Sequence, residues 1–197
     1  MRLDLSRRGL ITAAPALGLS AILAGCAITT GQIISPGDLY RIDDEATILA
    51  AARAIIAEDP VAALITLDEV GVPRVRSVGV SDPEADLTMW IGTRRTSRKV
   101  RQLRANPNAT LFFNFDDVTG NFAKAYYASF MGVATVHTDE ATLKATAPDA
   151  DTLKAFWPNF PDDFASIRFK PRWLEVTGHG IGGDKANWQP QAVILPR

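Results

Sequence analysis

Residues 93–99 carry the side chains of this sequence whose types and spacing are best suited to chemistry. The segment contains three hydroxyl groups and four cations, in the order Thr93, Arg94, Arg95, Thr96, Ser97, Arg98 and Lys99. It leads into a short helix predicted over residues 97–105, and a helix N-terminus offers free backbone N–H groups and about half a positive charge. Cations at this end are repelled by the helix dipole, so a bound anion would satisfy the donors and offset the repulsion. The segment therefore predicts a phosphate site; the alternative is a basic turn whose arginines extend into water.

The elements that must position this segment are short strands with short helices between them. Apolar spacing predicts a helix that begins after Asp43 or Asp44 and runs to about Glu58. Strands are predicted at residues 61–67, 73–80, 87–93, 109–115 and 125–136, with a final β pair at 164–169 and 172–177 around Pro171. Residues 138–157 are expected to be partly helical, with an interruption near Pro148. Mostly antiparallel hairpins favour a mainly β fold, a β-barrel with flanking helices, over a doubly wound sheet.

Five motifs follow one another in this arrangement. They are Val61–Leu67, Pro73-x-x-Arg76-x-Val78, Trp90-Ile-Gly-Thr93, Ser97-Arg98-Lys99 and Asn106-Pro107. In this order they resemble the pyridoxamine 5′-phosphate oxidase-like family over roughly residues 43–136. The resemblance implies an FMN-binding split barrel of the six-stranded antiparallel Greek-key type. It also implies a homodimer with the flavin at the subunit interface.

The resemblance assigns cofactor-binding roles by position. The residues concerned are Arg76, Ser77, Val78, Gly79, Gly92, Thr93, Ser97, Arg98, Lys99 and Tyr127. Arg98 and Lys99 would bind the FMN phosphate, with Gly92, Thr93 and Ser97 at the same site, and residues 76–79 would lie along the flavin. Tyr127 takes the position of a glutamine that contacts the ring in the oxidases. A phenol can stack or donate a hydrogen bond there, and ordinary strand packing is the alternative.

The C-terminal region departs from the true oxidases. Thr177 lies where they have a flavin-contacting tryptophan, no Arg-x-His follows it, and the substrate lysine expected near Ser81 is absent. We therefore expect an FMN-dependent oxidoreductase of unknown substrate, similar to the general stress protein branch, and not a pyridoxamine phosphate oxidase. Because a flavin carries out the redox chemistry itself, no side chain is assigned a catalytic role.

Several alternatives remain open from the sequence. The protein could bind FMN or another anionic ligand without turnover, a deazaflavin could replace FMN, or haem could bind with His137 or His179 as its axial ligand. Gly178–Gly183 is glycine-rich but lacks the following helix of a dinucleotide-binding loop, so we interpret it as a loop. This loop could lie over the flavin with Trp188 as a lid.

The first 26 residues have the features of a bacterial export signal. Arg7-Arg8 precedes an apolar run from Leu10 to Ala24, too short to span a membrane, and Leu23-Ala24-Gly25-Cys26 resembles a lipobox. We expect a twin-arginine signal peptide at residues 1–25, a lipidated tether at 26–42 and one domain at 43–197. The lipid on Cys26 would anchor the protein at the periplasmic side of the cell envelope. The alternative is ordinary signal cleavage beside an incidental cysteine.

Composition limits the classes of partner and site. The chain has 21 basic and 22 acidic residues; loss of three arginines and one aspartate with the signal leaves 18 and 21, a net charge of −3. This balance does not suggest a nucleic-acid-binding protein. Two histidines and a single cysteine exclude a zinc-finger arrangement and a disulfide within one chain. The expected partners are a second copy, the membrane and a small redox substrate, with no nucleic acid.

Overall fold

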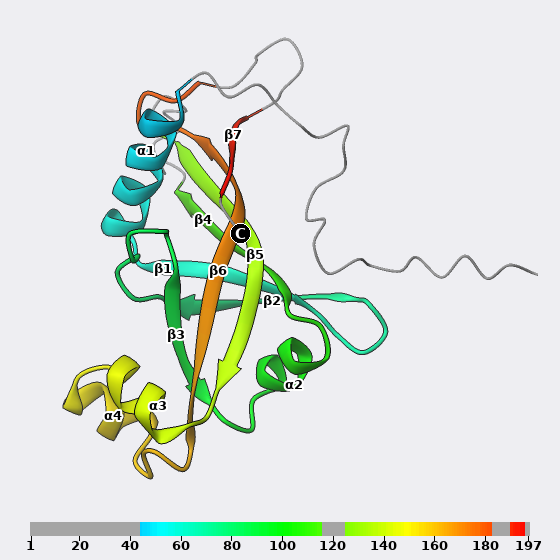
Figure 1. The fold of residues 1–197 in the computed structure, drawn as a ribbon, viewed down its shortest axis with the longest axis vertical. Coiled ribbons are helices and arrows are strands. Elements are labelled where there is room, and N and C mark those ends of the chain that lie inside the picture. Colours follow the sequence, from blue (N-terminus) through cyan, green and yellow to red (C-terminus); the bar gives the residue numbers. More distant parts are fainter. Residues whose placement is uncertain (1–43, 116–124, 183–189, 196–197) are drawn as a thin grey trace, which may run out of the picture. The chain divides into compact units, whose positions relative to one another are not determined.

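The computed structural model describes residues 44–115, 125–182 and 190–195, which form an antiparallel sheet flanked by helices (Figure 1). The elements are α1 Glu45–Glu58, β1 Val61–Leu67, β2 Pro73–Gly79, β3 Met89–Arg94, α2 Arg98–Ala105, β4 Asn108–Phe115, β5 Tyr126–His137, α3 Glu140–Thr146, α4 Ala150–Phe156, β6 Phe164–Thr177 and β7 Gln191–Ile194. The predicted signal peptide, the tether with Cys26, and Trp188 lie outside the described residues. Among the helices that are described, none has the length and apolarity needed to cross a membrane.

The strands follow the order β2-β1-β4-β5-β6-β3, and β7 pairs with β6 outside this path. All neighbouring strands are antiparallel. The end strands β2 and β3 do not pair with each other. A single backbone hydrogen bond links the segment after β2 to β3: the Ser81 amide donates to the Trp90 carbonyl at 2.9 Å. The sheet is therefore curled but not closed, and the predicted mainly β architecture is confirmed.

One face of the curled sheet forms the hydrophobic core together with α1. Alternate residues of the strands are fully buried, among them Leu64, Ile91, Leu111, Phe130 and Leu174. The apolar side of α1, which includes Ile48, Ala52 and Ile55, packs against this cluster. Because burial of each large aliphatic or aromatic side chain contributes about 1.5–3 kcal/mol, this face of the sheet fixes the strand register.

The prediction of a final β pair at residues 164–169 and 172–177 is wrong. These residues form one continuous strand, β6, and both halves pair with β5. Pro171 lies opposite Gly132, where the register between the two strands shifts after Met131. A proline lacks the N–H that a regular ladder needs, and such an irregularity is where a strand tolerates it. The strand β7 was not predicted from the sequence.

Candidate anion and cofactor site

Three predicted residues meet where β3 passes into α2. The Lys99 Nζ donates to the Thr93 Oγ1 at 3.0 Å, and the Ser97 Oγ lies 3.2 Å from the same oxygen. Thr93 is buried, with 3 % of its surface exposed, because it points to the interior face of β3. The end of β3 therefore fixes the position of Lys99 in the first turn of α2.

The N-terminus of α2 differs from those of the other described helices. In α1, α3 and α4 an aspartate at the N-cap accepts a hydrogen bond from a first-turn amide. The N-cap of α2 is Ser97, whose side chain makes no capping bond, and no acidic residue lies in the first turn. The first-turn amides thus retain their capacity to bind an anion.

Arg76 of β2 points toward this region from the interior of the barrel. Its guanidinium donates to the Leu64 carbonyl at 3.3 Å, to the Thr66 Oγ1 at 2.6 Å and to the Gln102 Oε1 at 2.7 Å. These three acceptors are neutral and come from β1 and α2, so they orient the side chain without neutralising it.

Arg76, Arg98 and Lys99 together form what we call the cation cluster. Burial lowers the pKa of Arg76, and the nearby Arg98 lowers it further. Burial likewise lowers the pKa of Lys99, with a second contribution from Arg76. Within the described part of the chain, no carboxylate pairs with any of the three. The fold therefore disfavours the charged forms of Arg76 and Lys99, and a bound anion would favour them.

These features fit the phosphate of FMN. A phosphate carries up to two negative charges and accepts several hydrogen bonds, and the site presents three cations and an uncapped helix N-terminus beside Thr93 and Ser97. The donor set is that of an oxyanion site. No group of three or more His, Cys, Asp or Glu side chains in the described residues could hold a metal ion.

The other predicted site residues occupy different faces of the sheet. Val78 is buried in the core, whereas Ser77 and Gly79 are exposed on the outer face of β2. Gly92 faces away from Thr93: a Cβ there would lie 2.9 Å from the Phe164 ring and 3.2 Å from that of Trp157. Only its backbone could line the cation cluster.

Tyr127 lies on β5, a strand that contributes no residue to the cation cluster. Its ring centroid is 5.7 Å from that of Phe112 on β4, and its backbone pairs with Thr177 of β6. This ring contact is the strand packing that the sequence left open as an alternative role.

Sequence reasoning missed Thr66 and Gln102, which are both buried and contact Arg76. One signal was present for each. Thr66 is the only polar residue in the apolar run of β1, and Gln102 follows Lys99 by one helical turn.

The two histidines are engaged within the fold. The His179 Nε2 lies 3.4 Å from the Glu58 Oε1, and its ring centroid is 4.9 Å from that of Tyr126. His179 and Gly180 have φ values of 51° and 83° in a tight turn closed by two hydrogen bonds between Gly178 and Ile181. The glycine-rich segment thus begins as a hairpin.

His137 lies at the end of β5, with its ring centroid 5.4 Å from that of Trp90. Its Nδ1 is 3.8 Å from the Asp139 Oδ2, and its buried Nε2 has no hydrogen-bond partner among the residues that the structure describes.

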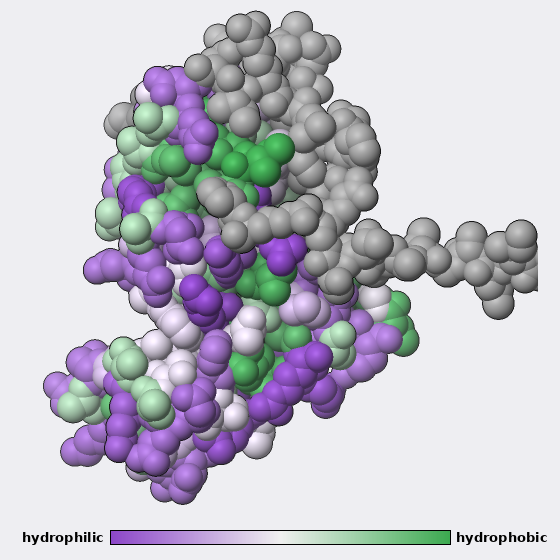
Figure 2. Space-filling view, viewed as in Figure 1, coloured by the Kyte–Doolittle hydropathy of each residue, from purple (hydrophilic) through white to green (hydrophobic). Residues whose placement is uncertain are grey.

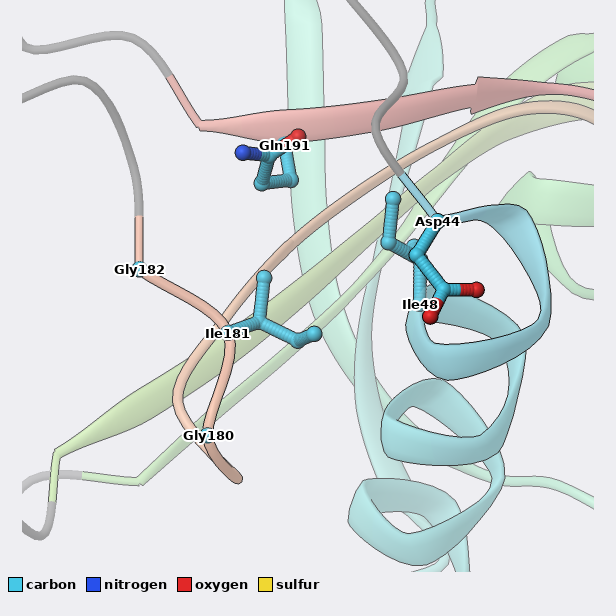
Figure 3. Close-up of a pocket in the computed structure, with 6 residues that line it drawn as sticks. All are labelled: Asp44, Ile48, Gly180, Ile181, Gly182 and Gln191. Carbon is cyan, nitrogen blue, oxygen red and sulfur yellow. The ribbon is translucent and has the colours of Figure 1, made fainter.

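A separate cavity of ≈ 250 Å³ lies beside α1 (Figure 3). Its lining residues are Asp44, Ile48, Gly180, Ile181, Gly182 and Gln191. None belongs to the cation cluster, and the Asp44 carboxylate already accepts hydrogen bonds from Thr47 as the cap of α1.

The comparison with family models decides the classification. The model described as pyridoxamine 5′-phosphate oxidase matches residues 48–177, which include the whole cation cluster. The chain belongs to the pyridoxamine 5′-phosphate oxidase family. No curated protein is similar enough to count as a match.

Solved structures agree with this family assignment at the level of the fold. A Clostridium acetobutylicum protein related to general stress protein 26 is 19% identical, with a TM-score of 0.57 over 69% of this chain and 91% of that one. General stress protein 26 from Bacillus anthracis is 19% identical, with a TM-score of 0.54 over 76% and 97%. A heme binding protein from Mycobacterium smegmatis is 17% identical, with a TM-score of 0.57 over 79% of this chain and 60% of that one. The split-barrel fold is thereby confirmed.

Proposed function

We propose that this protein is an FMN-dependent oxidoreductase and not a pyridoxamine 5′-phosphate oxidase. The observation that carries the proposal is the cation cluster, which has no carboxylate partner among the described residues and adjoins an uncapped helix. Family membership supports it, because proteins of this family typically bind FMN. The position of Thr177 and the missing Arg-x-His argue against oxidation of vitamin B6 compounds.

The protein residues would bind and orient the cofactor. Arg98, Lys99 and the first-turn amides of α2 would hold the phosphate, and Thr93 would keep the lysine in place. Ser77 and Gly79 would lie along the flavin on the exposed face of β2. FMN, when bound, supplies electron transfer through its ring. The substrate therefore has to be a small molecule that can reach this ring.

A titration of the full chain, purified in detergent, tests the proposal. FMN, a deazaflavin mononucleotide and haemin would be added separately, and absorbance and flavin fluorescence recorded. Saturable FMN binding, followed by bleaching with a reductant and recovery with an acceptor, is expected. Binding of haemin alone would replace the proposal with the haem alternative, and FMN binding without any electron transfer would indicate a carrier or sensor.

We also propose that the protein is a homodimer through the outer face of β1 and β2. On this face Val61 and Val75 are 50% and 64% exposed; Gly79 lies opposite Val61, and Ser77 lies between Gly79 and Val75 on β2. The β1–β2 turn exposes two further valines, Val70 and Val72 at 82% and 44%, beside the charged Asp68 and Glu69, and Figure 2 shows both apolar and polar surface on the molecule. Several exposed valines on one strand pair are compatible with a protein interface.

Sedimentation should give a mass of twice the chain. Val75→Glu places a charge on the outer face of the sheet without touching the core, so it should produce a folded monomer with weakened FMN binding. A wild-type monomer at all concentrations, still able to bind FMN, would contradict the dimer.

Export and lipid anchoring through Cys26 complete the proposal. They are supported by the twin-arginine pair, the apolar run and the lipobox-like exit in the sequence. In a bacterial host the wild-type chain should fractionate with membranes, and Cys26→Ser should release it into the soluble envelope fraction. Equal membrane association of both proteins would exclude a lipid anchor at Cys26.

A further inference from the structure

Gln102 and Thr66 together hold the guanidinium of Arg76. The Gln102 Oε1 accepts from the Arg76 Nη2 at 2.7 Å and from the Thr66 Oγ1 at 2.8 Å, while the Thr66 Oγ1 accepts from the Arg76 Nη1 at 2.6 Å. Only 4% of Gln102 and 1% of Thr66 are exposed. The three side chains therefore form a closed ring of hydrogen bonds between β1, β2 and α2, and the ring has few alternative geometries.

The acceptors in this ring are neutral, which distinguishes Arg76 from its neighbours. Arg74, two residues away on β2, pairs with Asp68 at 2.7 Å. Arg101, next to Gln102 on α2, pairs with Glu69 at 2.6 Å. A glutamate in place of Gln102 has the same shape and would give Arg76 the carboxylate that arginine ordinarily binds. The amide instead fixes the guanidinium and leaves its charge available.

We propose that Gln102 is a positioning residue whose neutrality keeps the cation cluster competent to bind an anion. Arg76 must be held still, because a free guanidinium would lose conformational entropy when the ligand binds. It must also stay unpaired, because a neighbouring carboxylate would compete with the ligand for it. An amide acceptor meets both requirements. This inference rests on the proposed function only for the identity of the anion, the phosphate of FMN. The existence of an anion site does not depend on it.

The test uses the full chain and two probes, inorganic phosphate and FMN. For Gln102→Glu, we expect affinity for both probes to fall about tenfold or more, because the new carboxylate pairs with Arg76 and opposes the phosphate. The melting temperature without ligand should not fall, since the new pair relieves the uncompensated charge. Gln102→Met should weaken binding and lower the melting temperature by about 2–4 °C, because it removes the acceptor of the Arg76 Nη2 and of the buried Thr66 hydroxyl.

The matched control is Arg104→Ala on the exposed side of the same helix, which changes the net charge by the same single unit. It should leave both affinities within about twofold. Wild-type affinity in Gln102→Glu would overturn the inference. So would a loss of affinity with a matching loss of thermal stability, since that indicates structural damage.

The two probes separate this inference from the proposed function. If the wild type binds phosphate but not FMN, and Gln102→Glu loses phosphate, the flavin proposal fails and the role of Gln102 stands. If the wild type binds neither probe, the cation cluster is not an anion site and the inference is overturned as well.

Discussion

Replacement of both Arg98 and Lys99 by alanine is expected to weaken FMN binding at least about 100-fold without unfolding the protein. Each charge-assisted hydrogen bond contributes about 1.5–3 kcal/mol, and each 1.4 kcal/mol corresponds to about tenfold in affinity. The loss of two such contacts therefore predicts an effect between about 10²-fold and 10⁴-fold. Fluorescence titration of FMN against wild type and variant measures it.

The double variant should not lose stability in the absence of ligand. The two cations lie at the positive end of α2 and near Arg76, so their removal relieves repulsion. The matched control is Arg101→Ala/Arg104→Ala, which removes the same charge from the same helix on its solvent side. Arg101 forms only an exposed pair with Glu69, so both affinity and melting temperature should change little.

An equal loss of FMN affinity in the two double variants would mean that the net charge of α2, and not the cation cluster, attracts the ligand. Unchanged affinity in the Arg98 and Lys99 variant would remove the phosphate site altogether. Only a selective loss, with a melting temperature that stays level or rises, agrees with a preformed anion site.

Local patterns were enough to bring together three of the residues predicted for the phosphate site. Thr93, Ser97 and Lys99 lie within seven residues, at the junction of a strand, a basic turn and a short helix. Their contacts are therefore local, and no long-range information was needed to bring them together. The boundaries of β1 were predicted correctly for the same reason, because an apolar run followed by a turn is a local signal. Arg76 was added by family resemblance and not by periodicity.

Contacts between distant residues could not be predicted in this way. Gln102 is separated from Thr66 by 36 positions and from Arg76 by 26, so only the packing of α2 against β1 shows that they meet. Likewise, Pro171 considered alone predicts the end of a strand. The strand continues through it because the register shift at Gly132, on β5, accommodates a residue without an N–H.

Gly132, the one glycine of β5, explains why this irregularity cannot take an added side chain. A Cβ on Gly132 would lie 2.3 Å from the Lys170 carbonyl oxygen and 2.8 Å from the Pro171 Cα. Both atoms belong to the backbone of β6, which also pairs with β3 from Phe169 back to Phe164. An alanine here must therefore displace the strand that holds β3, and with it Thr93.

Gly132→Ala is accordingly expected to lower the free energy of unfolding by about 3 kcal/mol or more. For a chain of this size that corresponds to a fall in melting temperature of at least about 6 °C, measured by circular dichroism. Two other glycines give a graded comparison. At Gly92 the added methyl would meet only aromatic ring atoms of Phe164 and Trp157, so the loss should be smaller; at Gly79 nothing lies within 4 Å, so the change should be close to zero.

The order of the three melting temperatures is the decisive result. If Gly132→Ala and Gly79→Ala have the same melting temperature, β5 and β6 can move apart at the bulge without loss of stability. The close contact at Gly132 would then not be needed for the barrel to hold together. If Gly92→Ala is the least stable, the ring packing beneath α4 matters more than the strand pairing. The predicted order, with Gly132→Ala lowest, would show that the close backbone approach of β5 and β6 limits the stability of the strand that holds β3.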